Sequence, residues 1–375
     1  MKRSFRLGKI LGIPVEINYT WFIIFGLITW TLARGYFPYV LPQYSALTHL
    51  IMAVIAAILL FLSLLLHELS HSIVAIKSAL PIKGITLFIF GGVAHMTKEP
   101  PDPKTEFKMA IAGPLCSFAL SFFFWIITNI LYNLKIAPPV VAITNYLFIL
   151  NGLVAIFNLI PGFPLDGGRI FRAGLWSYLK DLKKATRIAS NFGKGFAYFL
   201  MFVGLFEIFK FGALIPGFWL IFIGFFLLEA AEMSYQQVVM KTTLTGMQVR
   251  DIMTKDVVTV GADITLHDLV EQYFFKFRFH SFPVISDDTL LGLVTLHNVK
   301  EIPREEWGAK KAKEAMTPID ENLVISGDAE VTDALSKMAK NGVGRLLVIE
   351  DSKLIGILSQ RDIMSLFEFK TDLGG

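Results

Sequence analysis

The sequence predicts a polytopic α-helical membrane protein with six transmembrane helices and short membrane-associated β segments, followed by a soluble α/β module. Of the 375 residues, 54% are hydrophobic and 18% are charged, and the mean hydropathy of +0.57 is unlike that of a soluble protein. Residues 1–240 carry 19 Lys and Arg against 10 Asp and Glu, whereas residues 241–375 carry 16 against 21. The two parts therefore meet different solvents.

Six apolar runs define the expected spans. A helix needs about 17–25 apolar residues to cross the hydrocarbon layer, and the first and fifth runs are short for this purpose. We expect Gly113 and Pro114 to interrupt the third span near its start, and Gly113 to permit close contact with a neighbouring helix. The runs are 19–32, 51–76, 109–134, 140–160, 196–209 and 214–230.

The connections between the runs carry unequal positive charge. The N-terminal arm has four Lys and Arg, the second connection five and the fourth connection seven, whereas the alternate connections have one each. Since cytoplasmic loops carry the excess of Lys and Arg, we expect a multi-pass protein of the cell membrane with both termini in the cytoplasm. The basic residues 1–6 precede an alternating stretch, so a removable signal peptide is not expected.

Two stretches favour extended backbone. Residues 4–18 partly alternate apolar and polar side chains, and residues 84–96 form a β-like run that Gly91 and Gly92 divide. Non-helical backbone at membrane depth must line a cavity or pair with another segment, and a free strand edge can accept an extended peptide. The alternative is a hairpin that is satisfied by its own two arms.

The pattern His67-Glu68-Leu69-Ser70-His71 lies within the second run. Residues four apart share one face of a helix, so both imidazoles can converge on one Zn²⁺, and Glu68 can reach a water on the same ion. A chance match is the alternative. However, the rest of the run from Ile51 to Ile76 is free of charge, and an ionisable group at bilayer depth costs roughly 2.5–3.5 kcal/mol.

A zinc hydrolase needs three protein ligands and a water, and the two histidines supply only two. Asp166 is the expected third ligand, because the surrounding Pro and Gly residues place it on a bend after the fourth run. The alternative is a surface aspartate that caps the next helix. His95 is a weaker ligand candidate, and the amide of Asn151 or Asn158 could hold a substrate carbonyl.

These motifs resemble the intramembrane site-2 protease family of zinc metallopeptidases, peptidase family M50. The resemblance covers residues 1 to about 230 and implies one Zn²⁺ per chain, held by His67, His71 and Asp166, with Glu68 as general base and acid. It also implies that Asn158 steadies the scissile peptide or its oxyanion, and that the strand of Gly91 and Gly92 receives an unwound substrate helix. The motifs are His67-Glu-x-x-His71, Phe90-Gly-Gly92 and Asn158-Leu-Ile-Pro-x-x-Pro-Leu-Asp166-Gly-Gly-Arg169.

Residues 249–370 repeat themselves with an offset of about 64. Asp251-Ile-Met-Thr254 matches Glu314-Ala-Met-Thr317, and Phe282-Pro-Val-Ile285 matches Leu346-Leu-Val-Ile349. Each copy predicts the order strand, helix, strand, strand, helix. The segment resembles a tandem pair of CBS domains, which gives a membrane domain at 1–231, a linker at 232–248 and CBS domains at 249–306 and 307–370.

CBS pairs often bind adenine nucleotides, with a Ser/Thr-x-x-Asp element at the ribose. The resemblance therefore implies ATP, ADP or AMP near Ser359 and Asp362. The first repeat offers Thr295 and Asn298 instead, and the neutral amide puts a second nucleotide site in doubt. The alternative is a structural module, or one that joins two chains as a homodimer.

Two functions from different classes follow. The first is an intramembrane zinc endopeptidase that cuts transmembrane segments of single-span or other membrane proteins, with a nucleotide at the CBS pair controlling access. The second is a transporter or channel gated by the CBS pair, with the His/Asp cluster as an ion site. No inverted repeats are evident in the six runs, and a Glu between two ligands serves hydrolysis, which favours the first. The expected partners are the bilayer, substrate proteins and a nucleotide, and no nucleic acid.

Overall fold

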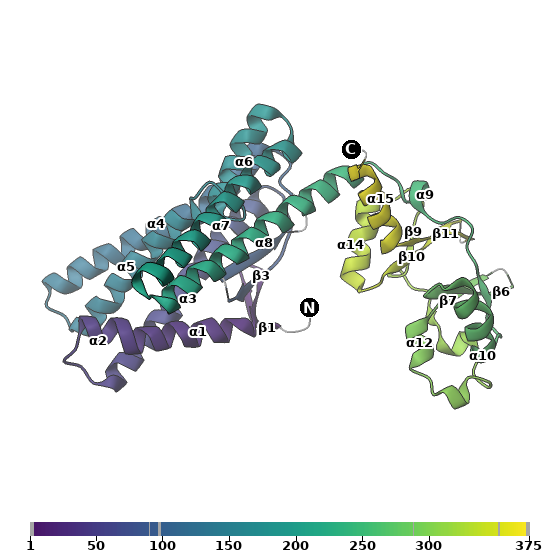
Figure 1. The fold of residues 1–375 in the computed structure, drawn as a ribbon, viewed down its shortest axis with the longest axis horizontal. Coiled ribbons are helices and arrows are strands. Elements are labelled where there is room, and N and C mark those ends of the chain that lie inside the picture. Colours follow the sequence, from purple (N-terminus) through teal and green to yellow (C-terminus); the bar gives the residue numbers. More distant parts are fainter. Residues whose placement is uncertain (1–3, 90, 97–98, 288, 352, 373–375) are drawn as a thin grey trace. The chain divides into compact units, whose positions relative to one another are not determined.

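Long apolar helices beside one small sheet form the first part of the chain, and two small sheets with short helices form the second (Figure 1). The structure is a computed structural model, and it describes residues 4–89, 91–96, 99–287, 289–351 and 353–372. It divides into two units, Met1–Val238 and Val239–Gly375, each of which is described by itself below.

In sequence order, the first unit has two strands, then helices, then a second pair of strands and then further helices. Its elements are β1 (Ser4–Ile10), β2 (Ile13–Asn18), α1 (Thr20–Thr31), the π-helix η1 (Leu32–Tyr36), α2 (Phe37–Val40), α3 (Ala46–Lys77), β3 (Ile82–Phe88), β4 (Gly91–Met96), α4 (Pro103–Asn133), α5 (Pro138–Asn158), α6 (Asp166–Leu179), α7 (Leu182–Phe211) and α8 (Leu214–Leu244).

Five helices of the described chain, α3, α4, α5, α7 and α8, are long and apolar enough to cross a membrane. The first apolar run forms α1, which has only 12 residues, although helical backbone continues through η1 and α2 to Val40. The expected interruption at Pro114 is wrong, because α4 runs through this residue. Proline removes a single backbone donor, and packing against neighbouring helices in a membrane protein lets the helix continue.

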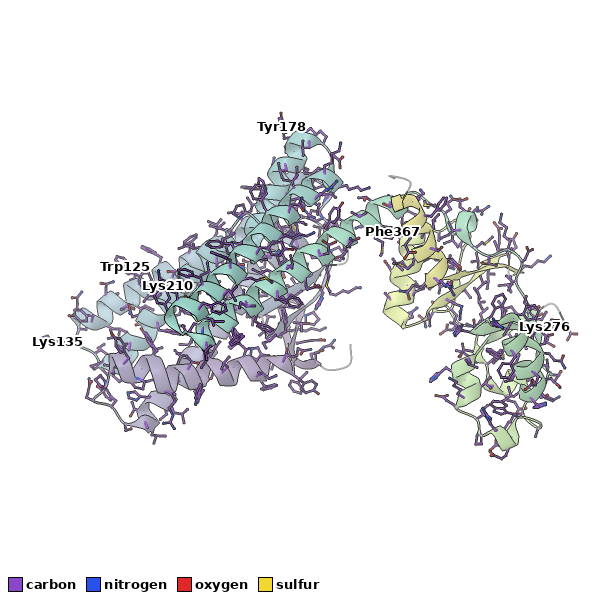
Figure 2. The ribbon with its side chains drawn as sticks, in the orientation of Figure 1. Trp125, Lys135, Tyr178, Lys210, Lys276 and Phe367 are labelled. Carbon is purple, nitrogen blue, oxygen red and sulfur yellow. The ribbon has the colours of Figure 1, made fainter. Side chains whose placement is uncertain are left out.

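The outer surface of these helices is apolar. Trp125 of α4 is 45% exposed, and it belongs to a large set of exposed aromatic and aliphatic side chains (Figure 2). Soluble monomers rarely expose apolar patches of this extent, so the helices are suited to a lipid environment. Figure 2 also shows Lys135, between α4 and α5, and Tyr178, near the end of α6, at opposite ends of this unit.

The sheet of the first unit has the strand order β1-β2-β3-β4. β2 and β3 are parallel, whereas the β1–β2 and β3–β4 pairs are antiparallel. Val15 of β2 and Ile85 of β3 pack on Leu69 of α3, which fixes the sheet against the helix that carries the His-Glu-x-x-His pattern. β4 is an edge strand and pairs, among the described strands, only with β3. The hairpin alternative therefore accounts for one edge of β4 and leaves the other edge open.

A buried ion pair joins α6 to α4. Arg172 Nε donates to Glu106 Oε1 at 2.7 Å, and the Nη2 of Arg172 contacts the same oxygen. The Arg172 guanidinium also lies 4.8 Å from the centroid of the Phe163 ring, which adds a cation–π contact. Both charged side chains are almost fully buried, at 3% and 0% exposed, and Arg172 also contacts Glu99 Oε2 at 3.4 Å. This pair fixes the helix that begins with Asp166.

The second unit contains two similar sheets. Its elements are α9 (Val249–Ile252), β5 (Val260–Gly261), α10 (Leu266–Leu269), the π-helix η2 (Val270–Phe274), α11 (Phe275–Phe277), β6 (Ser281–Ser286), β7 (Thr289–Thr295), α12 (Leu296–Lys300), the 3₁₀ helix η3 (Arg304–Glu306), α13 (Ala312–Ala315), β8 (Thr317–Pro318), β9 (Val324–Ile325), α14 (Val331–Asn341), β10 (Arg345–Glu350), β11 (Lys353–Ser359) and α15 (Gln360–Asp372).

The two repeats have the predicted order of elements. The first contributes β5, β6 and β7 to one sheet, which β8 from the start of the second completes, and the second forms the sheet β11-β10-β9. Phe282 and Leu346, which correspond in the two copies, are both fully buried and belong to separate hydrophobic cores. The expected linker is helical for most of its length, because α8 continues to Leu244, whose side chain lies in the core of the second repeat.

The ion pair of α4 and α6 gives a prediction about stability. Arg172→Met removes the side chain that donates hydrogen bonds to the buried Glu106 carboxylate, so the free energy of unfolding in detergent should fall by about 3–5 kcal/mol. The double variant Glu106→Leu/Arg172→Met should recover most of this loss, since it removes both charges. Lys184→Met, which breaks the exposed pair with Asp181, should change stability by less than about 1 kcal/mol. Equal losses in the Arg172 and Lys184 variants would contradict this account.

Candidate functional site

The imidazoles of His67 and His71 lie one above the other on α3. The two residues are four positions apart, so their side chains leave the same face of the helix. Their Nε2 atoms are 3.2 Å apart, and their side chains are 5% and 11% exposed. The helix therefore directs two nitrogen atoms to one point inside the first unit.

Asp166, at the start of α6, brings a carboxylate to the same point. Its Oδ2 lies 3.1 Å from His67 Nε2 and 3.2 Å from His71 Nε2. Leu165 is extended and Asp166 is the first residue of α6, so the carboxylate projects from a helix N-terminus. Gly167 and Gly168 let this first turn lie directly on the backbone of residues 159–163, where a Cβ would collide. The bend expected at Asp166 is thus the start of a helix.

The remaining ring nitrogens are held by α4. His71 Nδ1 is 2.6 Å from the carbonyl oxygen of Met109, and His67 Nδ1 is 2.8 Å from Ser117 Oγ. A carbonyl can only accept, so His71 carries its proton on Nδ1 and presents the Nε2 lone pair to the site. Contacts of this kind orient histidine ligands in metal sites.

The three side chains fit a Zn²⁺ ion. One ligand atom from each of His67, His71 and Asp166 lies within 4.8 Å of the others, and two imidazoles with one carboxylate are a common zinc donor set. Gly113 of α4 faces both histidines, and a Cβ at this position would meet both Nε2 atoms. The space in front of the ligand atoms therefore depends on a residue without a side chain.

Glu68 lines a cavity of about 210 Å³ beside the three ligand candidates. β4 forms one wall of this cavity, and a Cβ at Gly92 would lie 2.5 Å from Glu68 Cγ. The backbone of the edge strand therefore approaches the carboxylate as closely as a glycine allows. The lining residues are Glu68, His71, Ser72, Ala75, Ile82, Gly92, Val93, Ala94, Met96, Met109, Pro164, Asp166 and Arg169.

Several expected site residues are not among the described residues that line this cavity. Asn158 is the last residue of α5 and is not among the described residues that line the cavity. Asn151 is buried, and its Nδ2 donates to the carbonyl oxygen of Leu147 at 2.8 Å and to Ser63 Oγ of α3 at 3.4 Å, so its amide bonds within the helix bundle. His95 Nε2 contacts Thr86 Oγ1 at 3.0 Å and is outside the ligand cluster. Gly91 begins β4 with a φ of +123°, and Phe90 lies outside the described residues.

Other residues of the site were not predicted. Gly113 was expected only to allow close helix contact, and Ser117 was not singled out. Gly113 and Ser117 lie four residues apart in an apolar helix, so they share one face. This spacing is a usable signal that both residues contact the same group. Arg169 was noted only as part of a motif, yet its side chain lines the cavity. The pairing of Glu106 with Arg172 leaves no local pattern, because the two residues are far apart in sequence.

Both parts of the chain are similar to known proteins. The family model described as peptidase family M50 matches residues 55–136 and 133–203, and the CBS domain model matches 249–305 and 312–368. The zinc metalloprotease MJ0392 of Methanocaldococcus jannaschii is 34% identical over 379 residues, which cover 100% of this chain and 99% of that protein. The chain belongs to peptidase family M50.

Two further relatives extend this comparison for the M50 peptidase. Rip3 of Mycobacterium tuberculosis is 32% identical over 370 residues, which cover 98% of this chain and 94% of Rip3. A solved structure, the site-2 protease from Methanocaldococcus jannaschii, is 34% identical, covers 61% of this chain and 94% of that chain, and has a TM-score of 0.43. By its family, its long apolar helices and its match to the CBS model, the chain is a membrane metallopeptidase that carries a tandem pair of CBS domains.

Described residues of the CBS pair of this M50 peptidase line a cleft in each of two places. Ser359 and Asp362 line one of them, together with Arg278, Arg345 and Arg361. Asp362 Oδ2 accepts from the backbone N–H and the hydroxyl of Ser359, at 2.8 and 2.7 Å. The element thus caps α15 and borders a cleft with three guanidinium groups.

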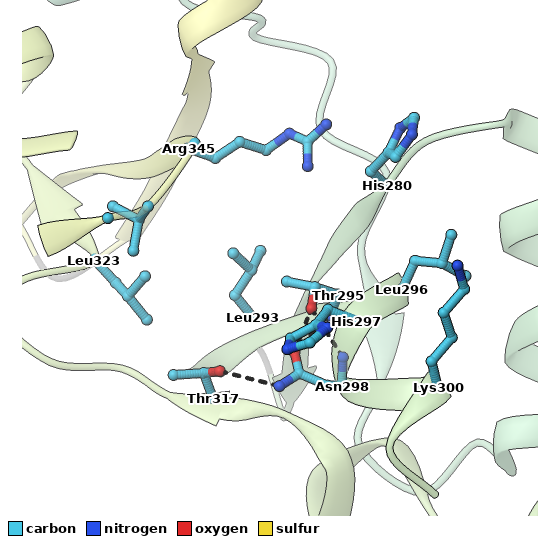
Figure 3. A pocket seen from close by; sticks show the side chains of 13 residues that line it. His280, Leu293, Thr295, Leu296, His297, Asn298, Lys300, Thr317, Leu323 and Arg345 are labelled. Atoms are coloured by element: carbon cyan, nitrogen blue, oxygen red, sulfur yellow. Dashed lines mark hydrogen bonds between the residues drawn. The ribbon is translucent and has the colours of Figure 1, made fainter. Parts of the chain in front are cut away.

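The other cleft holds the corresponding residues of the first repeat. Asn298 Oδ1 accepts from Thr295 Oγ1 at 2.6 Å, and its Nδ2 points to Thr317 Oγ1 (Figure 3). Arg345 lies across the cleft in Figure 3 and lines both clefts. The repeats therefore keep one capping geometry, with an amide in the first where the second has a carboxylate.

The position of Gly113 gives a prediction about metal affinity. Gly113→Ala should weaken zinc binding at least about tenfold, because the new methyl group occupies the space of the two Nε2 atoms. Zinc affinity is measured by competition with a chelator in detergent. Gly195→Ala on α7, whose Cβ would meet nothing within 4 Å, is the matched control and should bind zinc as the parent does. Unchanged affinity in both variants would rule out a metal at this position.

Proposed function

We propose that the chain is an intramembrane zinc endopeptidase that hydrolyses peptide bonds within transmembrane segments of other membrane proteins. His67, His71 and Asp166 would hold one Zn²⁺ per chain. The observation that carries the proposal is the approach of Asp166 Oδ2 to both Nε2 atoms, at 3.1 and 3.2 Å, beside a cavity that Glu68 lines. Membership of peptidase family M50 supports this activity over an ion site in a transporter or channel.

Glu68 is the proposed general base and acid. When bound, the metal polarises the scissile carbonyl and lowers the pKa of a water to about 7. Glu68 takes a proton from the attacking water as the new C–O bond forms. It then returns the proton to the amide nitrogen as the C–N bond breaks, so that the products are a carboxylate and an amine. A carboxyl group in the cavity wall has the reach that both transfers require.

The open edge of β4 is the proposed binding surface for the substrate. A substrate helix pairs its backbone groups internally, so it must unwind before a protease can reach a peptide bond. An extended segment regains those hydrogen bonds when it adds to a free strand edge. Gly92 would bring this segment beside Glu68, because the strand backbone lies against that carboxylate.

We further propose six spans with both termini in the cytoplasm. The unbroken helical path from Thr20 through η1 to Val40 supports a first span that α1 alone is too short to provide. The positions of Lys135 and Tyr178 at opposite ends of the first unit agree with loops on opposite sides of the bilayer (Figure 2). The basic connections then lie in the cytoplasm, as does the CBS pair.

An adenine nucleotide at Ser359 and Asp362 is the proposed regulator. Three arginines in that cleft suit phosphate groups, and a carboxylate oxygen can accept from ribose hydroxyls. α8 joins the membrane domain to the CBS pair. This one helix begins in the last proposed span and ends at Leu244, whose side chain lies in a CBS core. Binding could therefore alter the membrane domain through this helix.

Substitution of the general base tests the proposed reaction. Glu68→Gln should abolish cleavage of a single-span reporter tagged at both ends while the purified protein still holds one zinc, because the ligand set is untouched. Asp166→Asn should lose both zinc and cleavage. Gel analysis of the reporter and elemental analysis of the protein give the two readouts. Cleavage by the Glu68→Gln variant at the parent rate would refute the mechanism.

Calorimetry tests the nucleotide site. ATP, ADP or AMP should bind the parent, and Asp362→Ala should weaken that binding at least about tenfold, because a charge-assisted acceptor for the ribose is lost. Asn298→Ala in the other cleft is the matched control and should keep the same affinity. The reporter assay with and without the bound nucleotide then measures regulation. If none of the three nucleotides gives heat, the regulatory proposal fails.

A further inference from the structure

Arg169 lines the same cavity as the edge strand β4. It follows Asp166 by three residues in the first turn of α6, so both side chains leave the same side of the helix. Its side chain is 21% exposed and lines the cavity with Glu68 and Gly92. Among the described lining residues it is the only lysine or arginine. A fixed positive charge therefore faces the space where the peptide bond would lie.

Arg169 is held near the cavity without using its donors. Its Nε lies 3.9 Å from Glu106 Oε1, which is too long for a hydrogen bond but close enough for attraction. The same oxygen accepts from Arg172 Nε at 2.7 Å, so Arg172 satisfies it. Among the described residues, Arg169 donates no side-chain hydrogen bond. The guanidinium thus keeps donors available for a group that enters the cavity.

The proposed reaction needs such a donor. Negative charge develops on the scissile carbonyl oxygen as water attacks, and donors placed in advance at that oxygen stabilise the transition state. Asn158, the residue expected there, is not among the described residues that line the cavity. Ser72 does line it, but its hydroxyl donates to the carbonyl oxygen of Glu68 at 3.0 Å. Arg169 is the side chain that remains.

We propose that Arg169 is a catalytic residue whose guanidinium donates a hydrogen bond to the scissile carbonyl oxygen of a substrate segment on β4. The inference rests on the proposed peptidase function and adds a residue to it. As the C–O bond forms, the π electron pair of the carbonyl moves to the oxygen that Arg169 contacts. The pair returns as the C–N bond breaks and Glu68 protonates the nitrogen. Arg169 keeps its own protons throughout.

The test measures kcat and KM separately on a single-span reporter that the parent cleaves. Arg169→Gln should lower kcat by about 100-fold or more, the loss seen when one such donor is removed, with KM within threefold of the parent. Zinc content should stay at one per chain. Arg169→Lys, which keeps a charge with different geometry, should recover part of kcat. Arg187→Gln, an exposed position on α7, is the matched control and should behave as the parent.

A binding readout separates catalysis from structure. In the Glu68→Gln background, which should not turn over, Arg169→Gln should bind the intact reporter within threefold of the single variant. A kcat within threefold of the parent would overturn the role of Arg169, and so would loss of zinc or of reporter binding, since either would assign the residue to positioning. Absence of cleavage by the parent would instead overturn the proposed function and this inference with it.

Discussion

The meeting of two imidazoles and one carboxylate is the interaction on which the first unit depends. Asp166 follows His67 by 99 residues and His71 by 95 in the sequence. Its carboxylate nevertheless lies about 3 Å from both imidazoles, inside an apolar structure. Groups of this kind are costly in a low-dielectric interior unless each finds a partner. α4 completes the arrangement, because Met109 and Ser117 hold the outer nitrogens and Gly113 leaves room for the inner ones.

The rest of the membrane unit positions this cluster and gives it access. The sheet packs on α3 through Val15, Ile85 and Leu69, so its edge strand lies beside Glu68. The buried pair of Glu106 and Arg172 fixes α6, and through it the carboxylate that begins this helix. An apolar exterior suits the lipid, while the small cavity beside Glu68 is the proposed place of hydrolysis. Close approaches at Gly92, Gly113 and Gly167 contribute to this arrangement, because a Cβ at each of them would collide with a neighbour.

The sequence predicts those features that leave a local pattern. The spacing of His67 and His71 determines their shared face, the apolar runs predict the long helices, and the internal repeat predicts two similar sheets. Contacts between distant segments leave no such pattern, so the partnership of Glu106 with Arg172 could not be found. Asn151 shows a second limit, because a polar residue in an apolar helix can bond to its own backbone and to a neighbouring helix. Pro114 shows a third, since a proline within a span need not end the helix.

X-ray absorption at the zinc edge of the purified Glu68→Gln chain shows whether His67, His71 and Asp166 hold the metal. The account predicts a spectrum of low coordination number with imidazole scattering from two histidines at about 2.0–2.1 Å, together with oxygen ligands and no sulfur. The same measurement on a His71→Ala chain should show the loss of one imidazole or of the metal. A zinc spectrum with sulfur ligands, or one that His71→Ala leaves unchanged, would contradict the account.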